Sequence, residues 1–228
     1  RKSLTVAALC DQYLAAADRS QIMGKRRRPK KASTLATDRG RIERHIKPLL
    51  GRKLVSELTA ADINRFIRDV TAGKTAKVEK TGKKRGKAIV EGGAGTAART
   101  TGLLGGILSF AVSEGAIPFN PAAGVKRPAG NPRTRRLTPE EYRALGRALA
   151  KAEDERETEQ GIASAWLLAL TGCRLGEVLA LRWSEVDAAG RCFRLADTKE
   201  GASVRPVGAA AFDVLEAIAR NNHSPYVL

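Results

Sequence analysis

Residues that hold metal ions or form disulfides are scarce in this chain. Its 228 residues include three cysteines, Cys10, Cys173 and Cys192, which lie far apart and form no Cys-x-x-Cys pair. The only histidines, His45 and His223, have no carboxylate at ligand spacing. We therefore expect no metal site, no cofactor and no disulfide framework, but buried, inert thiols in a reducing cytoplasm.

Long apolar runs are also missing. The best run, residues 162–170, is about half of the roughly 18 residues that a membrane-spanning helix needs. Arg1-Lys2 is followed by an amphipathic pattern rather than by a secretory leader. Apolar residues still make up 43% of the chain, and its length suffices for one or two domains with cores of their own. We expect a cytoplasmic protein with no membrane contact.

Acidic residues are scarce in only one part of the chain. Residues 1–136 hold 30 Lys and Arg against 10 Asp and Glu, whereas residues 137–228 hold 11 against 14. The surplus in the first part predicts a polyanionic partner, because Lys and Arg that contact phosphates release counterions from nucleic acid. The alternative is a solubilising surface or a basic tail, but a tail would lack apolar periodicity. The charge alone does not separate DNA from RNA.

Helical periodicity runs through this basic part. Apolar residues recur at helical spacing over residues 4–18 and again over residues 33–50. Thr59 and Asp62 have the spacing of a capping box and predict the start of a third helix. A fourth helix, rich in small residues, is expected over residues 96–115, and its glycines predict close packing against a neighbour.

Residues 72–95 differ in composition, because basic residues alternate there with glycine and other small residues. The segment predicts either a flexible loop or a two-stranded basic ribbon, and we favour the loop. Its glycines and lysines lack the spacing of a phosphate-binding P-loop. The basic residues of the segment are Lys74, Lys77, Lys80, Lys83, Lys84, Arg85 and Lys87.

Prolines and the change in charge divide the chain into two domains. Asn120-Pro121 and a second proline-rich stretch ending at Pro132 interrupt the helical pattern. We predict a first domain over residues 1–127, a linker over residues 128–136 and a second domain over residues 137–228.

The second domain combines helices with a hairpin. Thr138-Pro139-Glu140-Glu141 has the residues of a capped helix start. A turn around residues 199–201 separates two segments of strand-forming residues. The expected elements are a buried helix over 162–170, a helix over about 174–182, strands over 192–196 and 204–207, and a last helix near 212–219.

One stretch of the second domain resembles a known motif. Residues Thr171 to Asp187 read TGCRLGEVLALRWSEVD, which is similar to the first arginine box of the tyrosine recombinases of the phage-integrase type. Asp197-Thr198-Lys199 and the following residues 204–207 resemble the lysine-bearing hairpin of that family. Asn120-Pro121 and residues 224–227 also fit its spacing. The resemblance covers nearly the whole chain and is most specific in the arginine box.

The resemblance implies a mainly α-helical fold with a small β-hairpin or sheet. A helical, SAM-like core-binding bundle would be followed by a truncated α+β catalytic domain. In that family a tyrosine attacks a scissile phosphate of duplex DNA and forms a 3′-phosphotyrosyl link. Two arginines stabilise the transition state, a lysine protonates the leaving oxygen, and no metal or nucleotide is needed.

The resemblance also implies that part of the active site follows Leu228. The His-x-x-Arg box and the nucleophilic tyrosine of the family would lie there, since Tyr13, Tyr142 and Tyr226 do not match the position of the nucleophile. We therefore expect an integrase fragment, encoded by a mobile genetic element, that does not cleave or rejoin DNA alone.

Three residues carry the expected catalytic site. Arg174 opens a helix after a glycine break, where its guanidinium and the free backbone N–H groups favour a phosphate. Lys199 at the hairpin tip can donate a proton to an alkoxide, and Glu177 is expected to orient the turn. The alternatives are an exposed Arg174–Glu177 ion pair of little energetic value and a solvated turn lysine.

Double-stranded DNA at a recombination site is the expected partner. The full-length protein is expected to associate with the nucleoid and to self-assemble on DNA. A non-catalytic DNA-binding remnant that acts as a regulator or competitor is the alternative function. An RNA-binding protein is disfavoured by the arginine box and by the lack of a stacking platform of aromatic residues. Besides the basic segment at 74–87, the expected DNA contacts are Lys31, Thr34, Arg39, Thr96 and Arg99.

Overall fold

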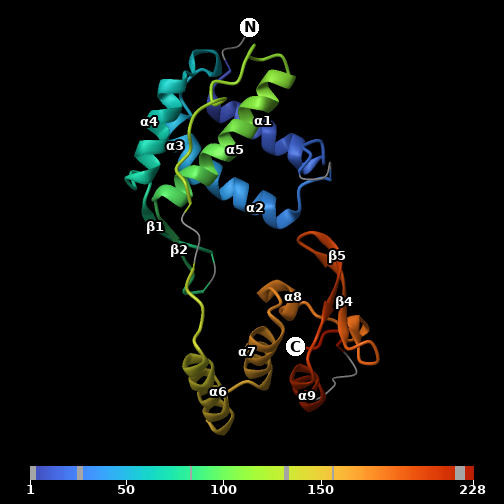
Figure 1. Ribbon diagram of the computed structural model, residues 1–228. Coiled ribbons are helices and arrows are strands. Elements are labelled where there is room, and N and C mark those ends of the chain that lie inside the picture. The colour runs from blue at the N-terminus through green and yellow to red at the C-terminus, as the bar shows by residue number, and fades with distance from the viewer. Residues whose placement is uncertain (1–3, 25–27, 83, 131–133, 156, 219–223) are drawn as a thin grey trace. The chain divides into compact units, whose positions relative to one another are not determined.

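The chain forms two compact units, Arg1–Arg133 and Thr134–Leu228, and each has a hydrophobic core of its own. The predicted fold class is confirmed, because the structure is mainly helical with two small antiparallel sheets. Within the described residues, no helix is both long enough and apolar enough to cross a membrane. Figure 1 shows the computed structural model, which describes residues 4–24, 28–82, 84–130, 134–155, 157–218 and 224–228.

The first unit is a helical bundle. Helix α5 contacts α1, α4 and the π-helical turn η2, and it runs diagonally across the bundle in Figure 1. Large apolar side chains at helical spacing, among them Leu9, Phe66 and Leu104, fill the core. The elements are α1 (Val6–Asp18), α2 (Ala32–Arg41), η2 (Ile42–Ile46), α3 (Lys47–Leu50), the 3₁₀ turn η3 (Val55–Glu57), α4 (Ala60–Thr71) and α5 (Ala94–Ser113).

Helix α4 begins at the capping box that the sequence predicts. The Asp62 backbone N–H donates to Thr59 Oγ1 over 3.3 Å, and the Thr59 N–H donates to Asp62 Oδ2 over 3.1 Å. Lys53 adds an ion pair 2.5 Å from Asp62 Oδ1. The ammonium of Lys53, followed by the hydrogen bonds from Thr59, lowers the pKa of the Asp62 carboxyl to about 2, against the opposing effect of burial.

This low pKa predicts how the stability of the first unit depends on acid. Because the pKa of Asp62 is lower in the folded chain than in the unfolded chain, its stabilising effect is complete above pH 3.8 and is lost as the pH falls towards about 2. Asp62→Asn should lower the free energy of unfolding by about 1 kcal/mol at neutral pH and flatten its decrease below pH 4. Urea unfolding at several pH values measures both effects. Glu57→Gln is the control, and an equal change in its pH profile would contradict the assignment to Asp62.

The segment between α4 and α5 contains a two-stranded antiparallel ribbon, so the flexible loop that we favoured for residues 72–95 is wrong. Strand β1 (Lys77–Lys80) pairs with β2 (Lys87–Val90), with Lys77 opposite Val90 and Lys80 opposite Lys87. A hydrogen bond from the Thr81 N–H to the Gly86 carbonyl closes the turn between them. The other structure that the composition allowed, a two-stranded basic ribbon, is the one observed.

Contacts with distant residues explain why the ribbon forms. Val90 is buried, and the Arg44 guanidinium on η2 lies 3.6 Å from Glu79 of β1. His45 Nδ1 lies 2.6 Å from Thr75 Oγ1 at the base of the ribbon. Burial, followed by the charges of neighbouring arginines, lowers the pKa of His45 and favours its neutral form. These anchors come from residues about thirty positions away, so local composition does not reveal them.

A glycine fixes the return of the ribbon to the bundle. A Cβ atom on Gly92 would lie 2.3 Å from the Val70 carbonyl oxygen and 2.6 Å from the Cα of Gly73. Only glycine allows the chain to approach the end of α4 this closely. The start of α5 is therefore placed against α4 by backbone packing.

The second unit packs helices and a three-stranded sheet around a smaller core. The strands have the order β3-β4-β5, and all are antiparallel. Phe193, Leu167 and Leu181 are among the buried core residues. The elements are α6 (Pro139–Asp154), α7 (Glu159–Thr171), α8 (Leu175–Leu179), the 3₁₀ turn η4 (Trp183–Glu185), β3 (Val186–Asp187), β4 (Cys192–Thr198), β5 (Gly201–Pro206) and α9 (Ala209–Ala217).

Several predictions for this unit need correction. The helix expected to be buried over 162–170 lies within α7, but Leu170 is 40% exposed because α6, α8 and α9 cover only part of its circumference. The helix expected over 174–182 ends at Leu179, because the following residues bond to the carboxyl-terminal segment. For example, the Trp183 N–H donates to the Pro225 carbonyl. Strand β3 was not predicted, since two residues carry no periodic signal.

The three thiols differ in accessibility. Cys10 and Cys192 are buried, whereas Cys173 is half-buried between α7 and α8. Burial raises the pKa of the Cys10 thiol to about 12, against the opposing charge of Lys47. The predicted burial of the thiols is therefore confirmed for Cys10 and Cys192, but it is wrong for Cys173.

Candidate functional site

Arg174 lies at a sharp break between two helices. Helix α7 ends at Thr171, and Gly172 follows with φ 62°, in the left-handed region that favours glycine. The Cys173 N–H donates to Thr171 Oγ1 over 3.2 Å, which fixes the turn. Arg174 then caps the start of α8, and its side chain is 48% exposed. The break therefore presents a guanidinium to solvent from a defined backbone position.

Glu177 holds Arg174 in this position. One carboxylate oxygen accepts the Arg174 backbone N–H at 2.9 Å, and the other accepts Arg174 Nη1 at 2.7 Å. The Glu177 side chain is only 8% exposed. The backbone N–H of Arg174 is the main cause that lowers the pKa of Glu177, and burial opposes it. An ion pair is thus present, but the side chain of its acid is largely covered and bonded to the backbone, unlike the exposed surface pair weighed above.

The hairpin turn that carries Lys199 lies beside Arg174. Lys199 and Glu200 connect β4 to β5 and are exposed. Thr198 Oγ1 donates to the Gly201 carbonyl over 2.6 Å, and Gly201 adopts φ 102°, so the turn is tight. Glu200 Oε1 lies 3.7 Å from Arg174 Nη2. The fold therefore brings the arginine box and the lysine-bearing turn together within the second unit.

A second guanidinium shares the carboxylate of Glu177. Arg205 on β5 places Nη2 3.8 Å from Glu177 Oε1. Its Nε is buried and has no hydrogen-bond partner among the described residues. We did not single out Arg205 in the sequence. The alternation of residues along β5 could have pointed to it, because residues 201, 203 and 205 share the half-buried face of the strand.

The tyrosines contact other parts of the molecule. Tyr13 is buried in the first unit, where its hydroxyl accepts from Lys30 Nζ over 2.7 Å. Tyr226 accepts from Arg182 Nη2 over 3.3 Å, and the same guanidinium lies over its ring. Tyr142 is half-exposed on α6. Among the side chains that the structure places, no group of His, Cys, Asp and Glu could hold a metal ion.

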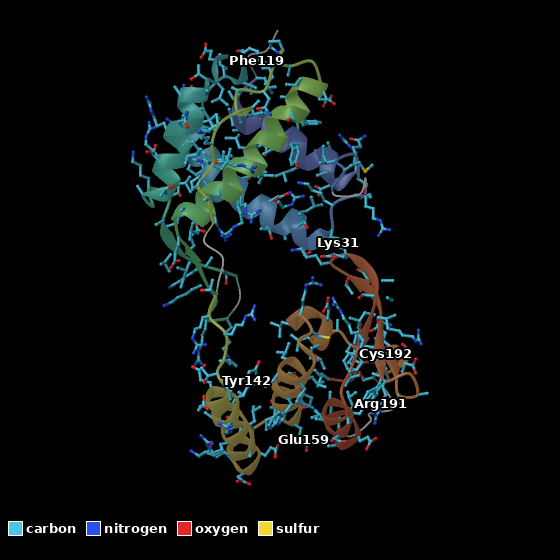
Figure 2. All side chains as sticks on the ribbon, in the orientation of Figure 1. Lys31, Phe119, Tyr142, Glu159, Arg191 and Cys192 are labelled. Carbon is cyan, nitrogen blue, oxygen red and sulfur yellow. The ribbon has the colours of Figure 1, made fainter. Side chains whose placement is uncertain are left out.

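The residues expected to contact DNA lie on two helices of the first unit. Lys31 and Thr34 are exposed at the start of α2, where Figure 2 labels Lys31. Arg39, further along α2, donates to Asp18 Oδ1 over 2.6 Å in an exposed pair. An exposed pair of this kind contributes little to stability, because solvent screens the two charges.

The other two expected contacts lie near the start of α5. Thr96 is half-buried, and its carbonyl accepts from Thr100 Oγ1 over 2.8 Å. Arg99 is exposed one turn later. Helix α5 contacts the η2 turn that continues α2, so both groups belong to one packed unit.

The ribbon separates its charges between two faces. On the face towards the bundle, Glu79 pairs with Lys77 and Arg44, and Val90 is buried. On the other face, Val78 and Ile89 are each 67% exposed and stand opposite one another. The cations of this outer face and of the turn have no hydrogen-bond or ion-pair partner among the described residues; they are Lys80, Lys84, Arg85 and Lys87. Lys83 lies outside the described residues.

Comparisons with known proteins support the fold. A lambda integrase dimer bound to a COC′ core site matches with a TM-score of 0.71 at 18% identity, over 98% of this chain and 70% of that chain. A second structure of a lambda integrase dimer bound to a COC′ core site matches with a TM-score of 0.69 at 18% identity, over 99% of this chain and 57% of that chain. The Tn1549 transposon integrase in complex with circular intermediate DNA gives 0.63 at 16% identity, over 98% and 68%.

These matches show that the chain has the fold of the integrases, as the resemblance implied. The chain spans 57% to 70% of the length of those three structures. No protein-family model matches the sequence, and no curated protein matches it.

Proposed function

We propose that this chain is part of a site-specific DNA integrase of the tyrosine-recombinase type. The first unit would bind duplex DNA, and the second would present Arg174 and Lys199 to the scissile phosphate. One observation carries this proposal: Glu177, whose side chain is largely covered, holds Arg174 at the start of α8, beside the hairpin turn that bears Lys199. The same arrangement supports Glu177 as a positioning residue rather than a plain surface charge.

The chemistry follows from the charges of these groups. In the full-length protein a tyrosine oxygen attacks the phosphorus, the bond to the 5′ oxygen breaks, and a 3′-phosphotyrosyl link forms. The Arg174 guanidinium stabilises the negative charge that develops on the phosphoryl oxygens. Lys199 donates a proton to the leaving 5′ oxygen, which departs as a hydroxyl. The covalent link stores the bond energy, so rejoining needs no nucleotide.

Binding of DNA by the first unit rests on its charge. Lys31, Thr34, Arg39, Thr96 and Arg99 supply phosphate contacts from α2 and α5, and the ribbon adds its unpaired cations. Such contacts set affinity and orientation without reading sequence. Nucleoid association, self-assembly on DNA and an origin in a mobile element belong to the same proposal.

Strand cleavage by the product of the complete gene tests the catalytic part. Arg174→Ala should slow formation of the covalent protein–DNA complex by about 10²- to 10³-fold, because a charge-stabilising donor is lost from the transition state. Arg194→Ala is the matched control, since Arg194 lies on β4 and pairs with Asp187 at 2.7 Å. It should cleave at the unaltered rate.

A modified substrate distinguishes a catalytic role of Lys199 from a structural one. Lys199→Ala should cleave ordinary DNA slowly but regain speed when sulfur replaces the leaving oxygen, because a thiolate departs without a proton. Equal rates for Arg174→Ala and the unaltered protein would refute the catalytic assignment. A complete gene product that binds DNA without forming a covalent complex would instead support the second candidate, a non-catalytic DNA-binding regulator or competitor.

A further inference from the structure

A shallow hollow in the first unit lies between α5 and the segment that follows it. Its volume is about 570 Å³. Two arginines contribute to its lining, Arg99 from α5 and Arg127 from the segment that follows. The remaining lining residues are small or apolar: Ala98, Gly102, Val125 and Pro128. No carboxylate lines it, so the hollow concentrates positive charge.

Both guanidiniums lack a partner in the part of the chain that the structure describes. Other cations of the same unit are neutralised: Arg39 pairs with Asp18, and Lys47 pairs with Asp11 and Glu43. Two arginines that share a hollow without an acid repel one another unless an anion lies between them. The planar forks of two arginines suit the oxygens of a phosphate.

Gly102 gives Arg127 its place against α5. A Cβ atom at position 102 would lie 2.7 Å from Arg127 Nη1, so any other residue would require the end of the Arg127 side chain to shift. The glycine weakens the helix relative to alanine, and its lack of a Cβ atom leaves room for the Arg127 guanidinium. Gly106 on the same helix has nothing within 4 Å of such an atom.

The segment that carries Arg127 is held by ordered contacts. Asn120 Nδ2 donates to the Gly105 carbonyl over 2.9 Å, and Asn120 Oδ1 accepts the Ala122 N–H at 2.9 Å. The Val125 N–H donates to the Ala122 carbonyl, and Val125 packs against the core. The backbone before Arg127 is therefore fixed to α5.

We propose that Arg99 and Arg127 together bind one backbone phosphodiester of duplex DNA, with Gly102 as the positioning residue. This inference rests on the proposed function of the first unit and adds Arg127 and Gly102 to its DNA-binding surface. It also means that the chain leaving the bundle contacts DNA, rather than serving only as a connection.

A variant that keeps every charge tests the geometry. Gly102→Ala retains both arginines but shifts the Arg127 guanidinium away from its present place, so duplex affinity measured by fluorescence anisotropy should fall roughly fivefold. The magnitude of the slope of log K against log salt should shrink by up to about 0.9, the value for one phosphate contact, since Arg99 still faces the same phosphate. Gly106→Ala is the matched control and should bind as the unaltered chain does. Thermal unfolding checks the fold of both variants, since alanine favours the helix.

A double variant shows whether Gly102 acts through Arg127. Arg127→Gln should weaken binding as Gly102→Ala does, and the two changes together should weaken it no further. Additive losses, or equal affinity of Gly102→Ala and Gly106→Ala, would overturn the proposal.

Titration with inorganic phosphate tests the anion site independently of DNA binding by the first unit. Shifts of the Arg99 and Arg127 side-chain NMR signals, absent in Gly102→Ala, would support the anion site. If the unaltered chain bound no duplex DNA, the proposed function would fail. If phosphate nevertheless shifted the arginine signals, the anion site would stand but DNA would be rejected as its ligand. If phosphate shifted no signals, the anion site would be rejected as well.

Discussion

Raising the salt concentration from 50 to 200 mM should weaken binding of duplex DNA to this chain by about 10³- to 10⁵-fold. That range applies to a protein that neutralises about 6–10 phosphates, because each contact releases counterions. The predicted contacts that carry charge, the unpaired cations of the ribbon and Arg127 supply a comparable number of candidates; the charged contacts are Lys31, Arg39 and Arg99. Fluorescence anisotropy with a labelled duplex over a series of salt concentrations measures the slope. A flat response would refute nucleic-acid binding.

The ribbon offers a matched pair of lysines for the same experiment. Lys87 lies on the outer face without a partner among the described residues, whereas Lys77 pairs with Glu79 on the face towards the bundle. Lys87→Gln should reduce the magnitude of the salt slope by about 0.9, and Lys77→Gln should leave it nearly unchanged. Equal effects of the two changes would mean that the ribbon contributes only general charge.

Removing the buried phenylalanine of one core should destabilise the unit that contains it and leave the other unit folded. Phe66 is 1% exposed in the first core, and Phe193 is 1% exposed in the second. Replacement of either by alanine should cost about 3–5 kcal/mol, through lost burial and the cavity that remains. A cost of this size is a large fraction of the stability of a domain. Phe66→Ala should therefore abolish DNA binding, whereas Phe193→Ala should leave binding by the first unit measurable.

The tryptophans make this separation visible. Both Trp166 and Trp183 belong to the second unit, so their fluorescence reports its unfolding alone, while far-ultraviolet circular dichroism reports both units. The second core is smaller, and Leu175 and Leu179 remain more than half exposed, so this unit should unfold at the lower urea concentration. Coincident shifts of both signals in Phe66→Ala would show one cooperative unit instead.

Local signals predicted the parts of the fold that depend on neighbouring residues. The capping boxes at Thr59 and Thr138 form because the interacting groups are three residues apart. The contact between Arg174 and Glu177 has the same spacing, and the family resemblance pointed to it. The left-handed Gly172 ends α7 where the glycine stands in the sequence.

Contacts between distant residues explain what the sequence did not reveal. The ribbon is anchored by a pair thirty residues apart, His45 and Thr75, and such a pair has no local pattern. Arg39 spans twenty-one positions to Asp18. The role of Arg205 depends on a strand that brings it back to Glu177, and the place of Arg127 depends on a turn that returns to α5. Sequence thus predicted the main elements more reliably than the partners of each charge.

The unequal burial of the three thiols gives the molecule a natural labelling position. Cys10 and Cys192 are shielded, and Cys173 is the partly accessible one, immediately before Arg174. A thiol-reactive dye would therefore attach beside the arginine box without any engineered cysteine. Energy transfer from that dye to a fluorophore on an oligonucleotide could report when the second unit approaches the duplex.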